Sequence, residues 1–287
     1  MTNNIQYVES IIKIQEIQKK IKLLQVTDMH LTLADETNTQ RTREIARQRE
    51  KEFAHEDWEN IDIFDQILSD ADKWADILVL TGDIMDFPSG LNLAKLDSRL
   101  NKDKKKYFFV PGNHDWNHYY INERKGWEPE FMEVLKPFTD NADYSELKID
   151  GVILIGIDNS RYQIGDYQFK RFKDTLSVGK PCILFMHIPI YIPSLESKTM
   201  ERWGSPIVMG IPEHLFGYRP GTIPSPMPTQ TTWEFCDAAL NSPNLRGIFT
   251  GHLHFSHKGI IPSGGYQYVS PPGYKARACK ITLQPDL

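Results

Sequence analysis

Short, almost purely apolar runs recur along the chain and are separated by longer segments with polar faces. Five of these runs lie at residues 21–27, 76–81, 107–110, 181–186 and 245–250. Runs of this length and composition are typical of strands that are covered on both faces, as in parallel sheets. The pattern therefore predicts an α/β fold in which buried strands alternate with helices.

Helical spacing of apolar residues marks most of the segments between these runs. It predicts helices at residues 41–53, 58–71, 130–136, 167–176 and 232–240. The segment 4–19 fits either an amphipathic helix or the alternation of a strand, and we favour the helix.

The second half of the chain adds antiparallel pairing. Residues 144–149 and 152–158 flank Asp150-Gly151, a dipeptide that is a strong signal for a two-residue hairpin turn. Further strands are predicted at residues 258–261, 266–270 and 276–283. Together with the parallel strands, they indicate mixed sheets.

Three stretches fall outside this alternation: an N-terminal extension (1–20), a polar insertion (31–60) and the segment 188–230. The last is crowded with proline and glycine and is too long for an ordinary connection; such loops are usually functional. We interpret it as part of a substrate lid on a single domain that spans residues 1–287. Its aromatic side chains would suit a small organic or nucleotide-like group: Tyr191, Trp203, Phe216 and Tyr218.

Composition and charge narrow the function classes. With 40% hydrophobic and 25% charged residues, the chain resembles an ordinary globular protein. Its net charge of −5 lacks the basic character that nucleic-acid binding needs, so a polynucleotide substrate is disfavoured. The N-terminus carries no secretory signal, and we expect a cytoplasmic protein without a membrane segment. The three cysteines imply no disulfide framework, and Cys182 and Cys279 are expected to be buried thiols.

Polar residues with metal-binding chemistry follow the predicted strands directly. Because open α/β sheets bind ligands at the carboxyl ends of their strands, these side chains are candidates for one common site. They combine carboxylate, amide oxygen and imidazole, the ligand set of Mn²⁺, Zn²⁺ and Fe. The residues are Asp28, His30, Asp83, Asn113, His114, His187, His252 and His254.

The spacing of these residues favours two metal ions. Asp28 and His30, like His252 and His254, are two positions apart on extended segments, so each pair projects to one side and can share an ion. The number of candidate ligands exceeds what one ion needs, which indicates two ions ~3.5–4 Å apart that share one carboxylate. Asp83 is the natural bridge.

The block Gly112-Asn113-His114-Asp115 offers acid/base chemistry as well. Asn113 supplies an amide oxygen, His114 an imidazole that can act as an acid or a base, and Asp115 a carboxylate that could orient the imidazole. Taken alone, the block is equally consistent with a polar turn. The similar chemistry after four other strands favours the functional interpretation.

Five blocks in order, Asp-x-His, Gly-Asp-x-x-Asp, Gly-Asn-His-Asp, a lone His and Gly-His-x-His, resemble the calcineurin-like metallophosphoesterase superfamily. The resemblance runs from Leu23 to about Leu283. It implies a four-layer αββα sandwich of two mixed sheets flanked by helices, with two metal ions (Mn, Fe or Zn) at the strand ends. It also implies two ligand sets: Asp28, His30, Asp83 and His254 for one ion, and Asp83, Asn113, His187 and His252 for the other.

The resemblance further implies that His114 contacts the phosphate and the leaving-group oxygen, with Asp115 behind it. Asp86 is either a carboxylate that orients a metal-bound histidine or a cap at the start of a helix. Since Asp86 stands where purple acid phosphatases have a tyrosine ligand, an Fe(III)-tyrosinate centre is not expected. His118 is either solvated or in contact with substrate.

The reaction that fits these residues is hydrolysis of a small phosphomonoester or phosphodiester, organic or nucleotide-like. Hydroxide that bridges the two ions would attack, and His114 would act as the general acid. Two alternatives are a nuclease of the same superfamily, which the acidic balance disfavours, and a metal-free interaction scaffold with the same fold. The scaffold predicts loss of ligand residues, whereas every ligand block is complete here.

Overall fold

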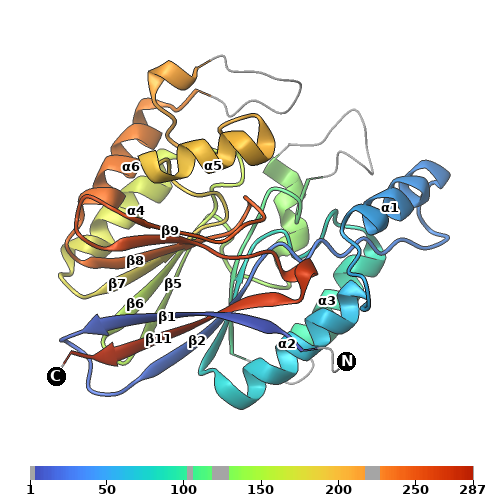
Figure 1. The fold of residues 1–287 in the computed structure, drawn as a ribbon, viewed down its shortest axis with the longest axis horizontal. Coiled ribbons are helices and arrows are strands. Elements are labelled where there is room, and N and C mark those ends of the chain that lie inside the picture. Colours follow the sequence, from blue (N-terminus) through green and yellow to red (C-terminus); the bar gives the residue numbers. More distant parts are fainter. Residues whose placement is uncertain (1–3, 102–105, 118–128, 217–226, 287) are drawn as a thin grey trace.

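The computed structural model describes residues 4–101, 106–117, 129–216 and 227–286. Two mixed β-sheets stack face to face, and helices cover both outer faces (Figure 1). The chain thus forms the four-layer αββα sandwich that the motif resemblance implies.

The first sheet has the strand order β1-β11-β2-β3-β4. Its strands are β1 (Gln6–Ile14), β2 (Ile21–Val26), β3 (Ile77–Thr81), β4 (Tyr107–Val110) and β11 (Arg277–Pro285). The neighbours β2, β3 and β4 are parallel, so their carboxyl ends lie at one edge of the sheet. Strand β11 runs antiparallel to β2 and carries β1 on its other side.

The second sheet has the order β5-β6-β7-β8-β10-β9. Its strands are β5 (Tyr144–Ile149), β6 (Val152–Ile157), β7 (Cys182–Phe185), β8 (Leu245–Thr250), β9 (His257–Ile260) and β10 (Tyr266–Val269). The four central strands are parallel and the two edge strands are antiparallel to their neighbours. The predicted hairpin is confirmed: Asp150 and Gly151 have φ angles of 45° and 92°, the signs that a type I′ turn requires.

Helices form the two outer layers. They are α1 (Gln40–Glu52), α2 (Asn60–Trp74), α3 (Gly90–Leu100), η1 (Pro129–Leu135), α4 (Asp166–Ser177), α5 (Pro193–Trp203), η2 (Glu213–Leu215), α6 (Gln230–Asn241) and η3 (Gly273–Lys275). The apolar faces of α2 and α3 pack on the first sheet, and those of α4, α5 and α6 pack on the second (Figure 1).

Three apolar clusters fill the spaces between the four layers. Along β2, Leu23 points into the space between the sheets, while Leu24 points to the helices outside. Along β7, Ile183 points between the sheets and Leu184 outward. Because both faces of these strands are buried, their sequences are apolar at nearly every position instead of at alternate ones.

The prediction of a helix at residues 4–19 is wrong, because residues 6–14 form strand β1. This strand pairs in parallel with β11 along its whole length, from Gln6 beside Arg277 to Ile14 beside Pro285. Ile12 and Ile14 are buried against the second sheet, whereas Lys13 between them is exposed. The period-two alternation was therefore the true signal, and pairing with a distant strand decided the ambiguity.

The segment 188–230 also has more regular structure than its composition indicates. It contains α5, whose first residue is Pro193 and whose C-cap is Gly204 with a left-handed φ of 64°. Proline at the start and glycine at the end are compatible with a helix, although the same residues in quantity suggest a loop. The apolar spacing did not predict helix α3; Ser89 caps it by accepting from the backbone N–H of Asn92. Tyr218, one of the proposed lid residues, lies outside the described residues.

All three cysteines are buried free thiols, as predicted for Cys182 and Cys279. Burial raises the pKa of the Cys182 thiol to about 11. Within the described ranges, no helix combines the length and the apolar character that crossing a bilayer requires.

Candidate dimetal site

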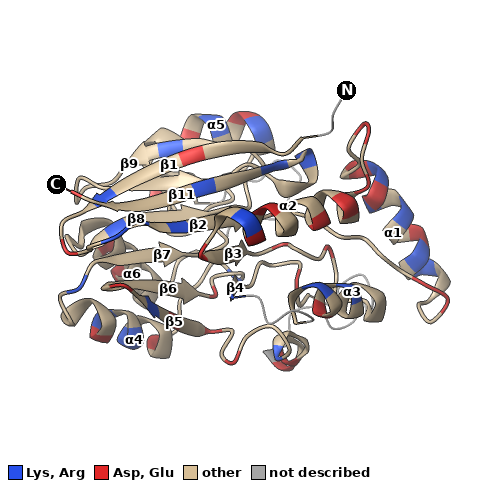
Figure 2. Ribbon diagram, turned by 90° about the horizontal axis from the view of Figure 1, so that it is seen from below, with Lys and Arg blue, Asp and Glu red and all other residues tan. Residues whose placement is uncertain are grey.

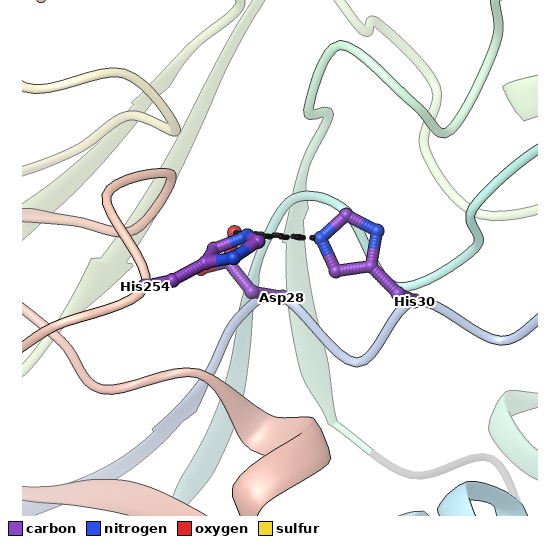
Figure 3. Close-up of side chains that lie close together, drawn as sticks. All are labelled: Asp28, His30 and His254. Atoms are coloured by element: carbon purple, nitrogen blue, oxygen red, sulfur yellow. Dashed lines mark hydrogen bonds and ion pairs between the residues drawn. The ribbon is translucent and has the colours of Figure 1, made fainter. Parts of the chain in front are cut away.

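The candidate residues gather where the carboxyl ends of the central strands of both sheets meet. Asp28 and His30 leave β2, and His254 follows β8, yet their side chains point toward one another (Figure 3). Asp28, His30, Asp83 and His187 are all at most 2% exposed at their side chains. A group of ionisable side chains buried this deeply needs compensating charge.

The backbone after each strand turns sharply, which aims these side chains at a common point. Of eight non-glycine residues with positive φ in the described part of the chain, five belong to the candidate set. They are Asp28 (51°), His30 (46°), Asp83 (51°), His252 (68°) and His254 (55°). A left-handed conformation costs roughly 1–2 kcal/mol for a residue with a side chain. Such strain persists where the surrounding structure holds it, and it concentrates at functional sites.

A first cluster joins the loops after β2 and β8. His30 Nε2 lies 3.1 Å from His254 Nε2, which in turn lies 3.3 Å from Asp28 Oδ1. The backbone N–H of His252 donates to both Asp28 oxygens, at 3.1 and 3.0 Å, and so ties the two loops together. The three side chains offer donor atoms within 4.8 Å of one another, a spacing that suits a single cation.

A second cluster comprises Asp83, His187 and His252. His187 Nδ1 lies 2.8 Å from the carbonyl oxygen of Thr81 and must donate to it, because a carbonyl only accepts. His187 Nε2 therefore faces Asp83 Oδ2 at 3.1 Å, but it makes no hydrogen bond there. Although burial opposes protonation, the Asp83 carboxylate raises the pKa of His187 to about 9. The negative potential that attracts this proton also suits a cation.

Asp83 lies between the two clusters. Its Oδ2 atom is 3.8 Å from His30 Nε2 in the first cluster and 3.1 Å from His187 Nε2 in the second. Its Oδ1 atom accepts from the backbone N–H of His114 at 2.9 Å. Close approach of the next loop requires glycine at position 112, since a Cβ atom on Gly112 would collide with Asp83 Oδ1. One carboxylate oxygen thus faces a histidine of each cluster, as a bridging ligand would.

Asn113 carries a further sign of a cation. Its Oδ1 atom is buried and has no hydrogen-bond partner among the described residues. Buried acceptors are nearly always paired, because leaving one unpaired is costly. Asn113 directly precedes His114, whose backbone N–H binds Asp83. An unpaired amide oxygen at this position fits a metal ion as its missing partner. The donors present therefore fit two cations.

Asp86 contacts two of the candidate histidines. Its Oδ1 atom lies 2.9 Å from His30 Nδ1 and 3.3 Å from His114 Nδ1. Arg49 binds the same carboxylate with Nε and Nη2, at 2.9 and 2.8 Å. Burial would raise the pKa of Asp86, but the hydrogen bond from Arg49 and the charge of His114 hold it well below its usual range. Asp86 thus orients a histidine, and the helix-cap alternative is wrong, since Ser89 caps α3.

His114 lies at the exposed side of the site, with 22% of its side chain accessible. Its Nδ1 atom is 2.9 Å from the backbone carbonyl oxygen of Asp86, so Nδ1 carries a proton and Nε2 remains free. One ring nitrogen also falls within 4.8 Å of donors on His30 and Asp83. Proximity alone therefore does not separate His114 from the candidate ligands.

Asp115 does not lie behind the ring of His114 as expected. Both of its oxygens accept from backbone N–H groups, Oδ2 from Asp83 and Gly112 at 2.8 Å and Oδ1 from Met85 at 2.9 Å. Burial and the nearby charge of Asp83 raise the pKa of Asp115 to about 7. Asp115 therefore joins the loops after β3 and β4, and the carboxylate beside His114 is Asp86.

Residues outside the motif blocks also contact the site, and three such contacts concern His252, His30 and Asp86. The hydroxyl of Tyr162 lies 2.8 Å from His252 Nε2, and Tyr162 itself has a positive φ of 61°. Phe53 stacks on His30, with ring centroids 4.0 Å apart and planes 11° apart. The third is the Arg49 pair with Asp86. No sequence signal marks these residues, because only the folded chain brings them to the site. His118 lies outside the described residues.

Two clusters of metal-binding donors at the strand ends of an αββα sandwich fit a metal-dependent hydrolase. The chain belongs to the calcineurin-like phosphoesterase family, whose model matches residues 21–256 and so includes all five motif blocks. No curated protein matches the chain.

The solved structures that match this chain are only distantly similar to it in sequence. A dimetal phosphatase from Danio rerio has a TM-score of 0.53 and 10% identity, over 90% of this chain and 89% of that chain. A purple acid phosphatase from yellow lupin (Lupinus luteus) has a TM-score of 0.49 and 12% identity, over 92% of this chain and 46% of that chain. A 5′-nucleotidase from Candida albicans has a TM-score of 0.43 and 14% identity, over 95% and 47%. At 10% identity, the likeness to the Danio rerio phosphatase shows the fold alone.

Proposed function

We propose that the two clusters hold two divalent cations and that the protein uses them to hydrolyse small phosphate esters. The single observation that carries this proposal is the position of Asp83. One of its carboxylate oxygens faces His30 of the first cluster at 3.8 Å and His187 of the second at 3.1 Å. A shared carboxylate between two donor sets is the arrangement of a two-metal hydrolase.

Each proposed ligand set combines carboxylate, imidazole and, at one ion, amide oxygen, which suits Mn²⁺, Zn²⁺ or Fe. The sets are Asp28, His30, Asp83 and His254 for the first ion, and Asp83, Asn113, His187 and His252 for the second. When bound, the ions supply charge neutralisation for the phosphoryl oxygens and activation of water near neutral pH.

His114 is the proposed general acid. The proton on Nδ1 is committed to the carbonyl oxygen of Asp86, so Nε2 is the atom that can give a proton to the leaving group. Its partial exposure supports contact with substrate. General acid catalysis of this kind contributes typically ~10²–10⁴-fold. The Asp86 carboxylate beside the ring offsets the positive charge of the imidazolium that this role needs.

The chain favours a small substrate over a polymer. The net charge of −5 argues against a polynucleotide. Trp203, at the end of α5 in the proposed lid segment, lies with its ring centroid 5.3 Å from that of His254 and donates to the carbonyl oxygen of Leu253 at 3.0 Å. An aromatic wall beside the proposed first cation suits an organic or nucleotide-like group.

The proposal is tested by metal content and activity on the same preparations. Wild-type protein reconstituted with Mn²⁺ should hold about two ions per chain and hydrolyse members of a panel of phosphomonoesters and phosphodiesters. Asp83→Asn should lose most occupancy at both sites, since Asp83 is shared. Asp62→Asn, at an exposed carboxylate on α2, is the matched control and should behave as wild type. Two ions retained by Asp83→Asn would contradict the bridge, and absence of hydrolysis by metal-loaded wild type would contradict the function.

A further inference from the structure

Helix α1, in the insertion 31–60, reaches the candidate site although little of it is buried. It projects beside α3 at one end of the molecule (Figure 1), and charges of both signs band its surface (Figure 2). Only Thr42 and Ala46 are buried within the helix. Apolar packing therefore accounts for little of its position, and its polar contacts at the site need another explanation.

The strongest of these contacts is the pair between Arg49 and Asp86. Arg49 donates from Nε to Oδ2 at 2.9 Å and from Nη2 to Oδ1 at 2.8 Å, which is a two-pronged arrangement. The Arg49 side chain is 16% exposed and that of Asp86 is fully buried. Because burying such a pair costs about as much desolvation as its attraction returns, it is a poor source of net stability. What it does provide is a fixed orientation of the carboxylate.

That orientation determines how two imidazoles are held. Asp86 Oδ1 faces Nδ1 of His30 at 2.9 Å and Nδ1 of His114 at 3.3 Å. A carboxylate only accepts, so His30 carries its proton on Nδ1 and turns Nε2 toward Asp28 and His254. Rotation of an unclamped Asp86 carboxylate would release this constraint.

Phe53, the C-cap residue of α1, holds the same histidine from its face. The rings of Phe53 and His30 stack at 4.0 Å and 11°, and the Arg49 guanidinium lies over the Phe53 ring at 4.5 Å from its centroid. Arg49, Phe53 and His30 thus form a continuous stack that is sealed from solvent at Phe53, which is 3% exposed. Residues from the C-terminal end of α1 therefore hold His30 in two ways: Arg49 acts through Asp86 on the Nδ1 edge of the ring, and Phe53 packs against its face.

We propose that Arg49, supported by Phe53, is a positioning residue of the first cation site. Through Asp86 it sets the tautomer and the ring orientation of His30, so that the 31–60 insertion controls how tightly that site binds metal. This inference rests on the proposed function, because it takes His30 as a ligand. Since His30 belongs to the first ligand set only, the effect is selective: the second site, with His187 and His252, keeps its affinity.

Calorimetric titration of metal-free protein with Mn²⁺ measures the two affinities directly. For Arg49→Gln we expect one binding event to weaken ~10–100-fold, the usual effect of removing a group that orients a ligand, and the other to stay unchanged. The affinity of the same site in Arg49→Lys should lie between those of wild type and Arg49→Gln, because an ammonium cannot bind both carboxylate oxygens in the same geometry. Arg47→Gln, at an exposed arginine on the same helix, is the matched control.

Two further measurements distinguish a positioning role of Arg49 from a loss of folded structure. Millimolar guanidinium added to Arg49→Ala should restore part of the lost Mn²⁺ affinity, whereas it would not rescue a variant that misfolds. Unfolding curves of each variant show whether the fold is intact. Unchanged affinity at both sites in Arg49→Gln, or equal weakening at both, would overturn the positioning role. Wild-type protein that binds two ions but cleaves no ester would refute the proposed function instead, while the titration would still decide the role of Arg49.

Discussion

Replacing His114 by alanine separates proton transfer from metal binding within one four-residue block. Its Nδ1 atom is occupied by the Asp86 carbonyl oxygen at 2.9 Å, which leaves Nε2 for the substrate. The side chain is 22% exposed, whereas that of His187 is fully buried against Asp83. We therefore expect His114→Ala to keep both cations and lose the general acid, and His187→Ala, the contrasting variant, to lose a cation.

The magnitude follows from the chemistry of the leaving group. For an alkyl phosphoester, whose departing oxygen needs a proton, kcat should fall ~10²–10⁴-fold. That fall corresponds to ~3–5 kcal/mol of transition-state stabilisation. A nitrophenyl ester, whose leaving group is stable as an anion, should be slowed far less by His114→Ala.

The assay measures kcat and KM for a series of esters from nitrophenyl to alkyl, together with the metal content of each preparation. Wild type and His114→Ala should diverge progressively as the leaving group becomes more basic. Loss of a cation in His114→Ala would make His114 a ligand and refute the assignment. Equal slowing of good and poor leaving groups would also refute it, since His114 would then act through phosphate binding or site geometry.

Two further predictions concern stability. Two bound ions, each at a free concentration ~100 times its Kd, stabilise the folded state by ~2.7 kcal/mol each. A chain of 287 residues has an unfolding entropy of ~0.6 kcal/mol/K, so chelation should lower the Tm by ~9 °C. Scanning fluorimetry with EDTA, and again after Mn²⁺ is restored, measures the Tm, and an unchanged Tm would contradict bound ions. Burial raises the pKa of Asp158 from 3.8 to about 6, so the folded state holds this proton more tightly and stability falls as pH rises from 4 to 6. Asp158→Asn should therefore gain up to ~3 kcal/mol relative to wild type between pH 4 and 7 in denaturant unfolding, and a pH-independent difference would refute this.

The chain's local patterns predicted the strands near the site well, and for a clear reason. Strands β2, β3, β4, β7 and β8 are apolar on both faces, and each is followed by a motif block. Periodicity and motif together therefore mark where β2 ends at Val26 and where β7 ends at Phe185. The Asp150-Gly151 turn is equally local, since two residues with positive φ define it. The assignment of individual ligands to two ions, and of His114 as the acid, stays a prediction.

These local patterns did not predict the contacts between residues far apart in the chain. Strand β1 depends on a partner at the other end of the chain, β11, and its own residues fit two structures. The carboxylate beside His114 is Asp86 and not its neighbour Asp115, because the turn after β4 directs Asp115 toward backbone N–H groups. Sequence adjacency is a poor guide to side-chain direction in a tight turn.

By itself, the sequence determined the α/β class, the central strands and the set of residues with metal-binding chemistry, because hydrophobic period and motif spacing act over a few residues. Only the tertiary structure decided that Asp83 lies between two clusters and that Arg49 and Phe53 from a polar insertion hold His30. These contacts join residues that are far apart in the chain, and their geometry depends on how two sheets and a peripheral helix pack. Such packing is a property of the whole fold, which no local pattern encodes.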